Sequence, residues 1–348
     1  MKIPTLPLKT ATTKKILFVF IAATGFVFVF GLFVLLFTKY IINHENFVLL
    51  HPNKDTQGLG ADYFPIGVDP AKKEIVENAS VDWYVESYLS IHVDESRKQR
   101  LFDRMVAELA KWDFYQQFAS PRSRVLVIYP GERKEEIAKN FGDILKWTKS
   151  EREQFMAAVV EAEPLISDGK FYPGRYVVDI DTSPEVVAET LNSRFDHEIA
   201  DKYNPEIATK VPLKDALTIA SLLEREAYDF TDMRYISGII WNRTFINMPL
   251  QLDATLQYVR GSKPSEPKWW PAVRPNDKFL SSPYNTYKNT GLPPAPIANP
   301  SVEAVVAALN PRATDCLFYF HDKNGEFYCS ATYEDHIASL KKVYGRGQ

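Results

Sequence analysis

The sequence lacks the short motifs by which several large enzyme classes are identified. It contains no His-Glu-x-x-His metal motif, no Gly-x-Ser-x-Gly nucleophile turn, no Walker loop and no Rossmann glycine pattern. Its six histidines, from His44 to His336, do not cluster along the chain. We therefore expect no metal and no cofactor, so any chemistry must come from acidic, amide, hydroxyl and aromatic side chains.

Cysteine is scarce, with Cys316 and Cys329 the only two in the chain. A C-x-x-C metal motif is absent. Both cysteines lie in a stretch that predicts a β-hairpin turning at Asp-Lys-Asn-Gly, residues 322–325. A disulfide is permitted outside the cytoplasm, but it depends on the strand register, which the sequence leaves open.

The chain as a whole also lacks a large excess of charge of one sign, because the net charge is only -3. This balance argues against nucleic acid as a partner. The N-terminus differs, since the run Ile16–Phe37 carries no charge and is long enough to span the ~30 Å hydrocarbon layer of a bilayer. The basic residues that precede this run, without any acidic residue, are Lys2, Lys9, Lys14 and Lys15. We predict a single-pass anchor in the cell (inner) membrane, with a cytoplasmic N-terminus and an extracytoplasmic body. The segment Phe37–Tyr40 is not a small-residue cleavage site, which argues against a signal peptide.

The rest of the chain predicts an α+β fold in successive parts. The expected division is a cytoplasmic tail at 1–15, a transmembrane helix at 16–38, a juxtamembrane connector at 39–82, a small α+β module at 83–205 and a mixed helical and loop-rich domain with a C-terminal hairpin at 206–348. In detail, strands are expected at 81–91, 125–128 and 169–180, and helices at 95–117, from 134, 184–195, 212–227, 235–245 and 302–309.

The candidate catalytic residue is Glu224, in the segment Leu217–Ala227. If Pro212 opens a helix, 100° steps place Glu224 inside an apolar stripe, while Ser221 and Arg225 point away. Lys214 also points away. The apolar stripe consists of Leu213, Ala216, Leu217, Ala220, Leu223 and Ala227. A carboxylate facing a core costs several kcal/mol unless it is paired or its pKa rises.

Two alternatives stay open for the acid. Glu224 could be a structural residue bonded to a buried arginine such as Arg243, since perturbed acids are enriched at active sites but not confined to them. Glu226 is the competing acid, and its predicted place near Asp215 at the stripe's edge is typical of a solvated carboxylate. With no other catalytic motif present, one buried acid and a loop region rich in amide, hydroxyl and aromatic groups suit a carbohydrate substrate.

Several segments together resemble the YceG-like family of endolytic murein transglycosylases. They are FYPGRY (171–176), VLVIYPGERKEEIA (125–138), IASLLEREA (219–227), NMPLQLDATLQY (247–258), SPYNTYKNTGLPPAPIANP (282–300) and AALNP (307–311). The resemblance runs from about Ser123 to Gly345, and its most specific part is the Y-N-T-Y-x-x-T-G-L-P-P run. One departure is Ala254, where the family commonly has proline after the aspartate. The resemblance also implies a single-pass anchor and a glycan-binding LysM-like module; that module is not evident between Asp62 and Ser120.

The resemblance implies a lytic transglycosylase that cleaves peptidoglycan between MurNAc and GlcNAc without water. The family's acid falls on Glu224, as general acid to the glycosidic oxygen and then general base to the sugar's 6-hydroxyl. The residues expected to bind substrate are Tyr284, Asn285 and Tyr287, with Gln251, Asp253 and Thr255. For each of them, loop architecture is the alternative. Trp269 and Trp270 are open between stacking on a glycan ring and filling a hydrophobic gap.

The expected partners are peptidoglycan strands and, through the anchor, the lipid bilayer, with peptidoglycan synthases as candidate protein partners. Two rival functions remain. One is a hydrolytic muramidase that uses Glu224 with Asp253 as the second carboxylate. The other is a non-catalytic glycan-binding scaffold, for which Glu224 would be dispensable.

Overall fold

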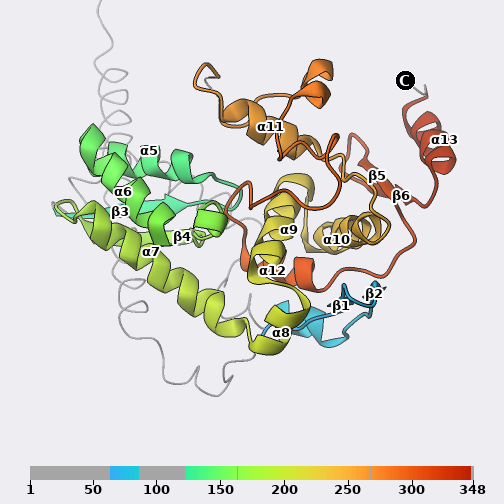
Figure 1. Ribbon diagram of the computed structural model, residues 1–348, viewed down its shortest axis with the longest axis horizontal. Helices are drawn as coiled ribbons and strands as arrows, with labels where there is room; N and C mark the ends of the chain where they lie inside the picture. Colours follow the sequence, from blue (N-terminus) through green and yellow to red (C-terminus); the bar gives the residue numbers. More distant parts are fainter. Residues whose placement is uncertain (1–62, 86–121, 163, 267, 346–348) are drawn as a thin grey trace, which may run out of the picture. The chain divides into compact units, whose positions relative to one another are not determined.

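The computed structural model describes residues 63–85, 122–162, 164–266 and 268–345, whose helices and strands are labelled in Figure 1. The predicted anchor at 16–38, most of the predicted connector and the predicted helix at 95–117 lie outside these residues. Within the described ranges, no helix combines the length and the apolar character needed to cross a bilayer.

A two-stranded antiparallel sheet and the helices on it build the upstream part. Strands β3 (Ser123–Ile128) and β4 (Gly174–Asp179) pair along their full length, with Ser123 opposite Asp179 and Ile128 opposite Gly174. Between them the chain forms α5 (Lys134–Ile144) and α6 (Lys149–Ala162). Every second residue of β3 is buried, which is the period of a strand with one face on a core.

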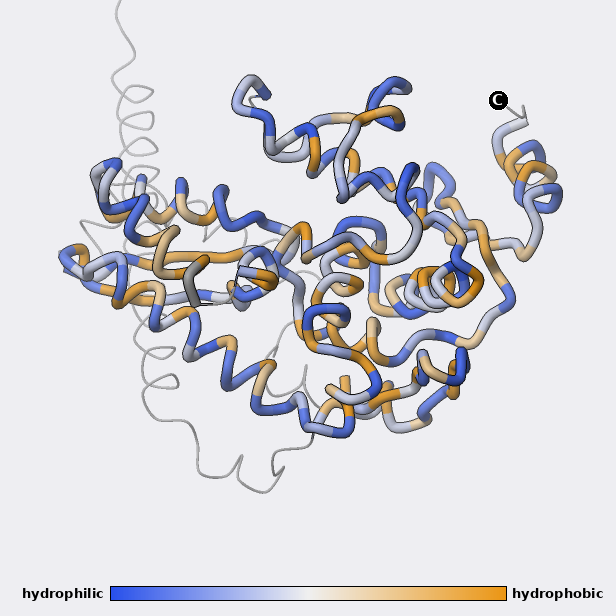
Figure 2. Tube along the Cα trace, viewed as in Figure 1, coloured by the Kyte–Doolittle hydropathy of each residue, from blue (hydrophilic) through white to orange (hydrophobic). Residues whose placement is uncertain are grey.

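The core of this part is aromatic. Phe155 is fully buried, and its ring lies 6.0 Å from Phe141, 5.2 Å from Trp147 and 5.9 Å from Phe171 between centroids. Helix α7 (Pro184–Glu198) closes the core from the side of α6, and its hydropathy alternates along the helix in Figure 2. Ring pairs of this kind stabilise a core beyond the area that they bury.

A second, larger core lies among three helices, α9 (Leu213–Glu226), α10 (Phe230–Phe245) and α12 (Val302–Leu309), which contact one another pairwise (Figure 1). Every residue of α12 is buried except Glu303, and α9 is buried from Ala216 to Leu223. A helix that is apolar on nearly all sides is expected at the centre of a core. The short strands β1 (Val68–Asp69) and β2 (Glu74–Ile75) cover one side of this core through Val68.

The remaining elements are η2 (Pro164–Ile166), η3 (Ala200–Lys202), α8 (Pro205–Lys210), α11 (Asp253–Gly261), η4 (Pro275–Phe279), β5 (Phe318–His321), β6 (Phe327–Ser330) and α13 (Tyr333–Tyr344). Side chains accept from the first-turn amides at five helix starts, the positions where unpaired N–H groups need acceptors. These caps are Ser183, Asn204, Asp229, Ser301 and Thr332.

The predicted hairpin is confirmed, and the structure settles its register. Strands β5 and β6 pair antiparallel with Tyr319 opposite Cys329, and Gly325 occupies the turn with φ +83°. Cys316, just before β5, forms a disulfide with Cys329, with their Cα atoms 5.7 Å apart. The bond joins the chain entering the hairpin to its returning strand.

The mixed α+β class is confirmed, and the helices expected from 134, at 184–195, 212–227, 235–245 and 302–309 are all present. The strand predicted at 81–91 is wrong for its described part, because residues 80–85 are helical. There the Asn78 side chain accepts from the amide of Ser80, and such a cap favours a helix start over a strand. Helices α11 and α13 fall in stretches where the sequence predicted none.

Candidate active site

The candidate acid, Glu224, lies in the last turn of α9, beside Ser301, the N-cap residue of α12. Its Oε2 accepts two hydrogen bonds from Ser301, one from the amide at 3.0 Å and one from Oγ at 2.8 Å. Ser301 also caps α12, where its Oγ accepts from the amide of Ala304. Oε1 of Glu224 accepts no hydrogen bond from any described residue and is not among the side-chain oxygens sealed from solvent. Among the described residues, Ser301 thus holds Oε2, and Oε1 is left without a hydrogen bond.

Burial raises the pKa of Glu224 above its ordinary value. The two donors of Ser301 and the cation of Arg225 oppose this shift, while the nearby carboxylate of Glu303 reinforces it. Glu224 also lies at the negative end of α9 and the positive end of α12, whose dipoles act on the carboxylate in opposite senses. The result is a carboxyl group that holds its proton to higher pH than a solvated glutamate does.

The alternative pairing of Glu224 with Arg243 is wrong. The Arg243 guanidinium donates to three backbone carbonyls, those of Leu317 at 2.6 Å, Leu250 at 2.6 Å and Pro249 at 3.2 Å. Arg243, in α10, therefore binds the chain entering the hairpin and the loop before α11. The hydrogen bonds to Glu224 come from Ser301 instead.

The segment that follows Pro294 runs alongside α9 in the same direction. Lys214 donates to the carbonyl of Pro294 at 3.4 Å, and the amide of Ile297 donates to Ser221 Oγ at 3.0 Å. Ser301 then meets Glu224. The prediction that Ser221 points away from the core is wrong for this reason, because the proline-rich segment covers that side of the helix and buries the hydroxyl completely.

The upstream part closes another side of the acid. Gly131, in the turn after β3, has φ +84°, and a Cβ there would lie 3.7 Å from Glu224 Cγ. Asn299 holds this turn in place: its Nδ2 donates to the carbonyl of Glu132 at 2.8 Å, and its Oδ1 accepts from the amide of Phe171, also at 2.8 Å. The backbone of Asn299 adds two bonds, to Gly131 and Glu132. The turn and the acid are therefore parts of one site.

A second set of contacts, after that of the Gly131 turn, joins the upstream part to the rest of the chain at the start of α5. Asp168, buried, accepts from Lys134 Nζ at 2.5 Å and from the hydroxyl of Tyr258 at 2.7 Å. Burial raises the pKa of Asp168, and the ammonium of Lys134 opposes that rise. Arg133, also buried, lies 4.3 Å from the ring centroid of Tyr258. These contacts fasten α11 to the upstream part.

The prediction that Glu226 is a solvated carboxylate is wrong. Its Oε2 accepts from the hydroxyl of Tyr319 at 3.0 Å, and its Oε1 accepts from the amide of Ala254 at 3.3 Å. Burial raises the pKa of Glu226. The helix pattern could not reveal this, because the groups that enclose Glu226 come from β5 and α11, far along the chain.

Two of the predicted binding residues are buried, Asn285 in a loop and Thr255 in α11. Asn285 is fully buried, and its Nδ2 donates to the carbonyls of Lys278 at 3.1 Å and Leu280 at 2.8 Å. Thr255, also fully buried, donates to the carbonyl of Leu252 at 2.7 Å. Since neither side chain reaches the surface, we assign both the architectural role that the sequence left open.

The other predicted binding residues reach the surface. Tyr287 donates from its hydroxyl to Asp253 Oδ1 at 2.7 Å, and the carboxylate of Asp253 acts electrostatically on Glu226. Gln251 is exposed and held at φ +52°, with its amide bonded to the carbonyl of Thr286. Such a conformation is uncommon outside glycine and often accompanies function. The ring of Tyr284 packs on α11. A binding role stays a prediction for these four residues.

Two tryptophans after α11 pack against arginines. The centroid of the Trp270 ring lies 4.0 Å from the guanidinium carbon of Arg225, and Arg133 lies 5.7 Å from Trp269. A Cβ at Gly261 would meet the carbonyl of Trp269 at 1.9 Å, so this loop lies directly on the end of α11. The sequence missed Arg225 as a site residue, because its partner Trp270 is remote in sequence.

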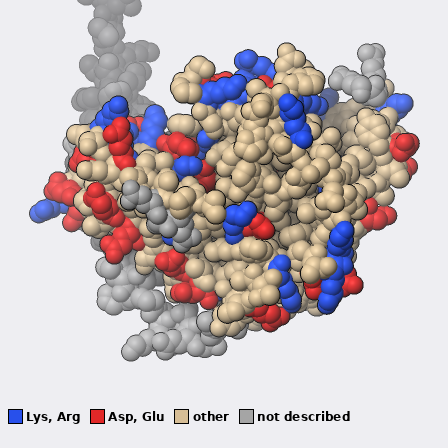
Figure 3. Space-filling view, viewed as in Figure 1, with Lys and Arg blue, Asp and Glu red and all other residues tan. Residues whose placement is uncertain are grey.

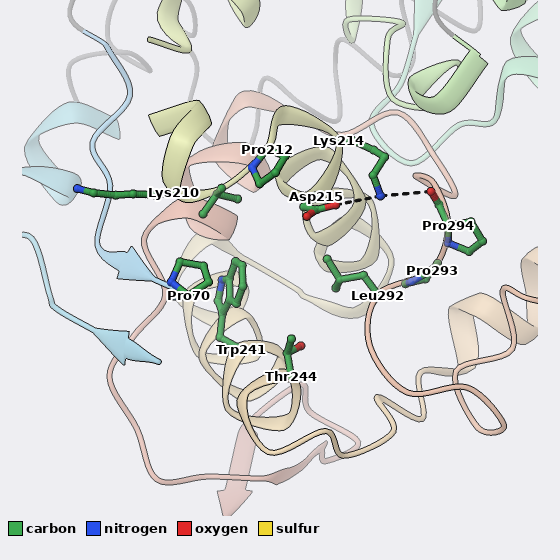
Figure 4. A pocket seen from close by; sticks show the side chains of 11 residues that line it. Pro70, Lys210, Pro212, Lys214, Asp215, Trp241, Thr244, Leu292, Pro293 and Pro294 are labelled. Atoms are coloured by element: carbon green, nitrogen blue, oxygen red, sulfur yellow. Dashed lines mark hydrogen bonds and ion pairs between the residues drawn. The ribbon is translucent and has the colours of Figure 1, made fainter. Parts of the chain in front are cut away.

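A pocket of about 380 Å³ lies at the opposite end of α9 (Figure 4). There Lys214 lies between the carboxylate of Asp215, at 2.9 Å, and the carbonyl of Pro294. Asp215 and Glu224 are about 14 Å apart along the helix axis at 1.5 Å per residue, so the pocket is separate from the acid. Its lining consists of Pro70, Lys210, Val211, Pro212, Lys214, Asp215, Trp241, Thr244, Leu292, Pro293 and Pro294.

Among the described residues, no three His, Cys, Asp or Glu side chains converge as metal ligands would. On the face seen in Figure 3, basic and acidic side chains are interspersed around a broad area without charge. A desolvated carboxyl group such as Glu224, with one oxygen free of hydrogen bonds to described residues, has the chemistry to give and take a proton.

The comparison with known families identifies the chain. The YceG-like family matches residues 71–342, and the chain belongs to that family. The match covers both sets of contacts, the acid and the disulfide hairpin.

Similar proteins agree with this assignment. An endolytic murein transglycosylase of Bacillus subtilis (strain 168) is 36% identical over 177 residues, which are 50% of this chain and 47% of that protein. One from Streptococcus pneumoniae serotype 2 is 30% identical over 170 residues, 49% of this chain and 31% of that protein. The chain thus matches less than half the length of each of these relatives. The crystal structure of a yceG-like protein from Listeria monocytogenes, 32% identical, covers 62% of this chain and 76% of its own with a TM-score of 0.53.

Proposed function

We propose that this chain is an endolytic peptidoglycan lytic transglycosylase. It cleaves the MurNAc–GlcNAc β-1,4 bond inside nascent glycan strands, leaves a 1,6-anhydro-MurNAc end and so terminates strand elongation. The names of the Bacillus and Streptococcus relatives support the reaction class. The observation in this chain that carries the proposal is Glu224, with Oε2 held by Ser301 and Oε1 open.

The chemistry needs only one carboxyl group. Protonated Glu224 gives its proton to the glycosidic oxygen as the bond from that oxygen to C1 breaks. The carboxylate then takes the proton of the 6-hydroxyl of the same MurNAc, and O6 forms the new bond to C1. No water is consumed, so the second carboxylate of a hydrolytic glycosidase is not required.

The surroundings of Glu224 suit both halves of this cycle. Burial raises its pKa and so keeps the proton available at higher pH, as a general acid requires. The two donors of Ser301 stabilise the carboxylate once the proton has left. The surface residues Tyr284, Tyr287, Gln251 and Asp253 are the proposed contacts to sugar.

The location of the enzyme is part of the proposal. We place the body outside the cytoplasm, anchored in the cell membrane by residues 16–38, where it would meet nascent strands and the synthases that make them. The lysines before Ile16 and the uncharged run after them support this orientation. The disulfide between Cys316 and Cys329 suits an oxidising compartment.

We further propose that the upstream part is a glycan-binding, LysM-like module within the predicted range 83–205, and that the catalytic domain spans 206–348. The order of its elements, β3, α5, α6 and β4 with the two strands antiparallel, supports this proposal. A module of this kind would hold the strand while Glu224 acts on it.

The test is the chemistry of the released ends. The full-length chain, solubilised in a mild detergent, is incubated with purified peptidoglycan, and the products are analysed by mass spectrometry. Anhydro-muramyl ends that disappear with Glu224→Gln are expected. Reducing ends that are one water heavier would identify a hydrolase, with Asp253→Asn as the next variant. Binding to glycan without cleavage would identify a scaffold.

A further inference from the structure

The guanidinium of Arg225, next to the proposed acid, stacks on a ring but has no hydrogen-bond or ion-pair partner among the described residues. That guanidinium carries five N–H donors. Three carboxylates, those of Glu136, Glu226 and Glu224, act on it electrostatically, yet none lies within ion-pair distance. Arg225 is exposed, so these donors are open to a ligand.

The guanidinium is nevertheless held in one place. The ring of Trp270 lies 4.0 Å from its central carbon, a stacking distance for a cation on an aromatic face. On another side lies Gly131, where a Cβ would approach Nη1 to 3.3 Å and Cδ to 3.5 Å. An arginine whose plane is fixed by a ring loses less freedom when it binds a planar anion.

Trp270 in turn is positioned by the upstream part. It interacts with the carboxylate of Glu136, in the first turn of α5, and Arg133 lies 6.0 Å from its ring centroid. Oε2 of Glu136 is buried without a hydrogen-bond partner. The Glu136 carboxylate interacts with Trp270 and acts on Arg225 only electrostatically, without an ion pair between them.

We propose that Arg225, stacked on Trp270, binds a carboxylate of the substrate beside Glu224 and thereby determines which strands are cleaved. The inference rests on the proposed function. The sugar rings of peptidoglycan are neutral in their hydroxyl and acetamido groups, so an arginine fork selects a carboxylate that they bear. That carboxylate has two sources, the peptide attached to MurNAc or, where the peptide has been removed, the lactyl group of MurNAc itself.

The experiment compares the full-length chain with three variants on four substrates. The substrates are glycan strands with peptides, strands stripped of peptides by an amidase, and each of these after their carboxyl groups have been amidated with methylamine. Arg225→Gln removes the cation, Arg225→Lys keeps a charge without the fork, and Trp270→Leu removes the stacking surface. Initial rates of anhydro-end formation give kcat and KM.

For Arg225→Gln we expect KM to rise about tenfold on carboxylate-bearing strands, as loss of a charged hydrogen-bonded contact would produce, with kcat little changed. On amidated strands the variant and the unaltered chain should agree within about twofold. Arg225→Lys should fall between them, and Trp270→Leu should resemble Arg225→Gln. A loss confined to peptide-bearing strands identifies the peptide carboxylate, and one confined to stripped strands identifies the lactyl carboxylate.

Three results decide against the inference. An equal loss on amidated strands would mean that Arg225 supports the fold, which thermal unfolding of the variants would show directly. No loss on any strand would mean that the guanidinium does not touch the substrate. If the unaltered chain cleaves none of the four substrates, the proposed function itself fails, and that outcome is distinct from the other two.

Discussion

The two sides of the last turn of α9 place similar carboxyl groups in different surroundings. Glu226 uses both oxygens, one for Tyr319 and one for Ala254, and both partners are fixed by distant parts of the chain. Glu224 concentrates its bonds on Oε2 and leaves Oε1 open. Burial raises the pKa of both groups, so burial alone does not distinguish an acid that reacts from one that holds the fold. The distribution of hydrogen bonds between the two oxygens is what favours Glu224 as the proposed acid.

The largest expected effect comes from replacing Glu224, the proposed acid. Glu224→Gln keeps the size and the acceptor for Ser301 but removes the proton, so the rate of anhydro-end formation should fall by about 10²–10⁴-fold. The matched change Glu226→Gln, two residues away, should keep the rate within about tenfold per folded molecule. Rates that fall alike in both variants would break the distinction between the two glutamates.

Removing the disulfide tests the support of Glu226, because the disulfide-bonded hairpin contains Tyr319, whose hydroxyl donates to Glu226. Cys316 and Cys329 are separated by 13 positions, and replacing both by alanine should lower the free energy of unfolding by about 3 kcal/mol. Urea titration of the full-length chain measures this change. We expect the rate at 25 °C to be little changed, since neither hydrogen bond to Glu224 comes from the hairpin; a rate loss without a stability loss would contradict this.

Removing the Glu226 carboxylate should destabilise the fold by about 1–3 kcal/mol in Glu226→Ala, because the hydroxyl of Tyr319 and the amide of Ala254 lose their acceptor. Glu226→Gln is the control, since its carbonyl can accept from the amide of Ala254 while its NH2 donates to the hydroxyl oxygen of Tyr319.

The pH dependence of the same variants sharpens the point. A carboxyl group whose pKa is raised on folding binds more protons in the folded than in the unfolded state, so its stabilisation is present at low pH and lost as pH rises from the ordinary glutamate range through the raised value. The difference in unfolding free energy between the unaltered chain and Glu226→Gln should therefore shift in favour of the unaltered chain as pH falls from neutral. A difference independent of pH would show that Glu226 has the same pKa in both states.

The smallest effect concerns Ser301. Ser301→Ala removes the cap of α12 and should lower the free energy of unfolding by about 1 kcal/mol. It also removes one of the donors that oppose the rise in the Glu224 pKa, so that pKa should rise further and the alkaline limb of the rate profile should move to higher pH. An alkaline limb that stays in place or moves to lower pH would mean that Ser301 does not stabilise the carboxylate.

The sequence predicted what depends on near neighbours and missed what depends on distant ones. The α9 pattern located Glu224 because its stripe repeats every few residues, and the alternation in β3 is equally local. The pattern misjudged Ser221 and Glu226, because Ile297, Tyr319 and Ala254 reach them from other elements.

The candidate site was predicted in the same uneven way. The motif resemblance selected Asn285 for binding, but its amide is used entirely within its own loop. Arg225 carried no signal, because a helix wheel cannot show that a ring from another loop lies over its guanidinium.

Asn299 gives the molecule a property that its division into parts would not suggest. One amide side chain bonds to Glu132 on one side of the upstream part and to Phe171 on the other, while the next residues of its loop lead to Ser301 and the acid. Exchange of the upstream part between relatives by recombination would therefore have to preserve both backbone positions within hydrogen-bond reach. A chimera that lost this geometry would leave the carbonyl of Glu132 and the amide of Phe171 without the Asn299 side chain.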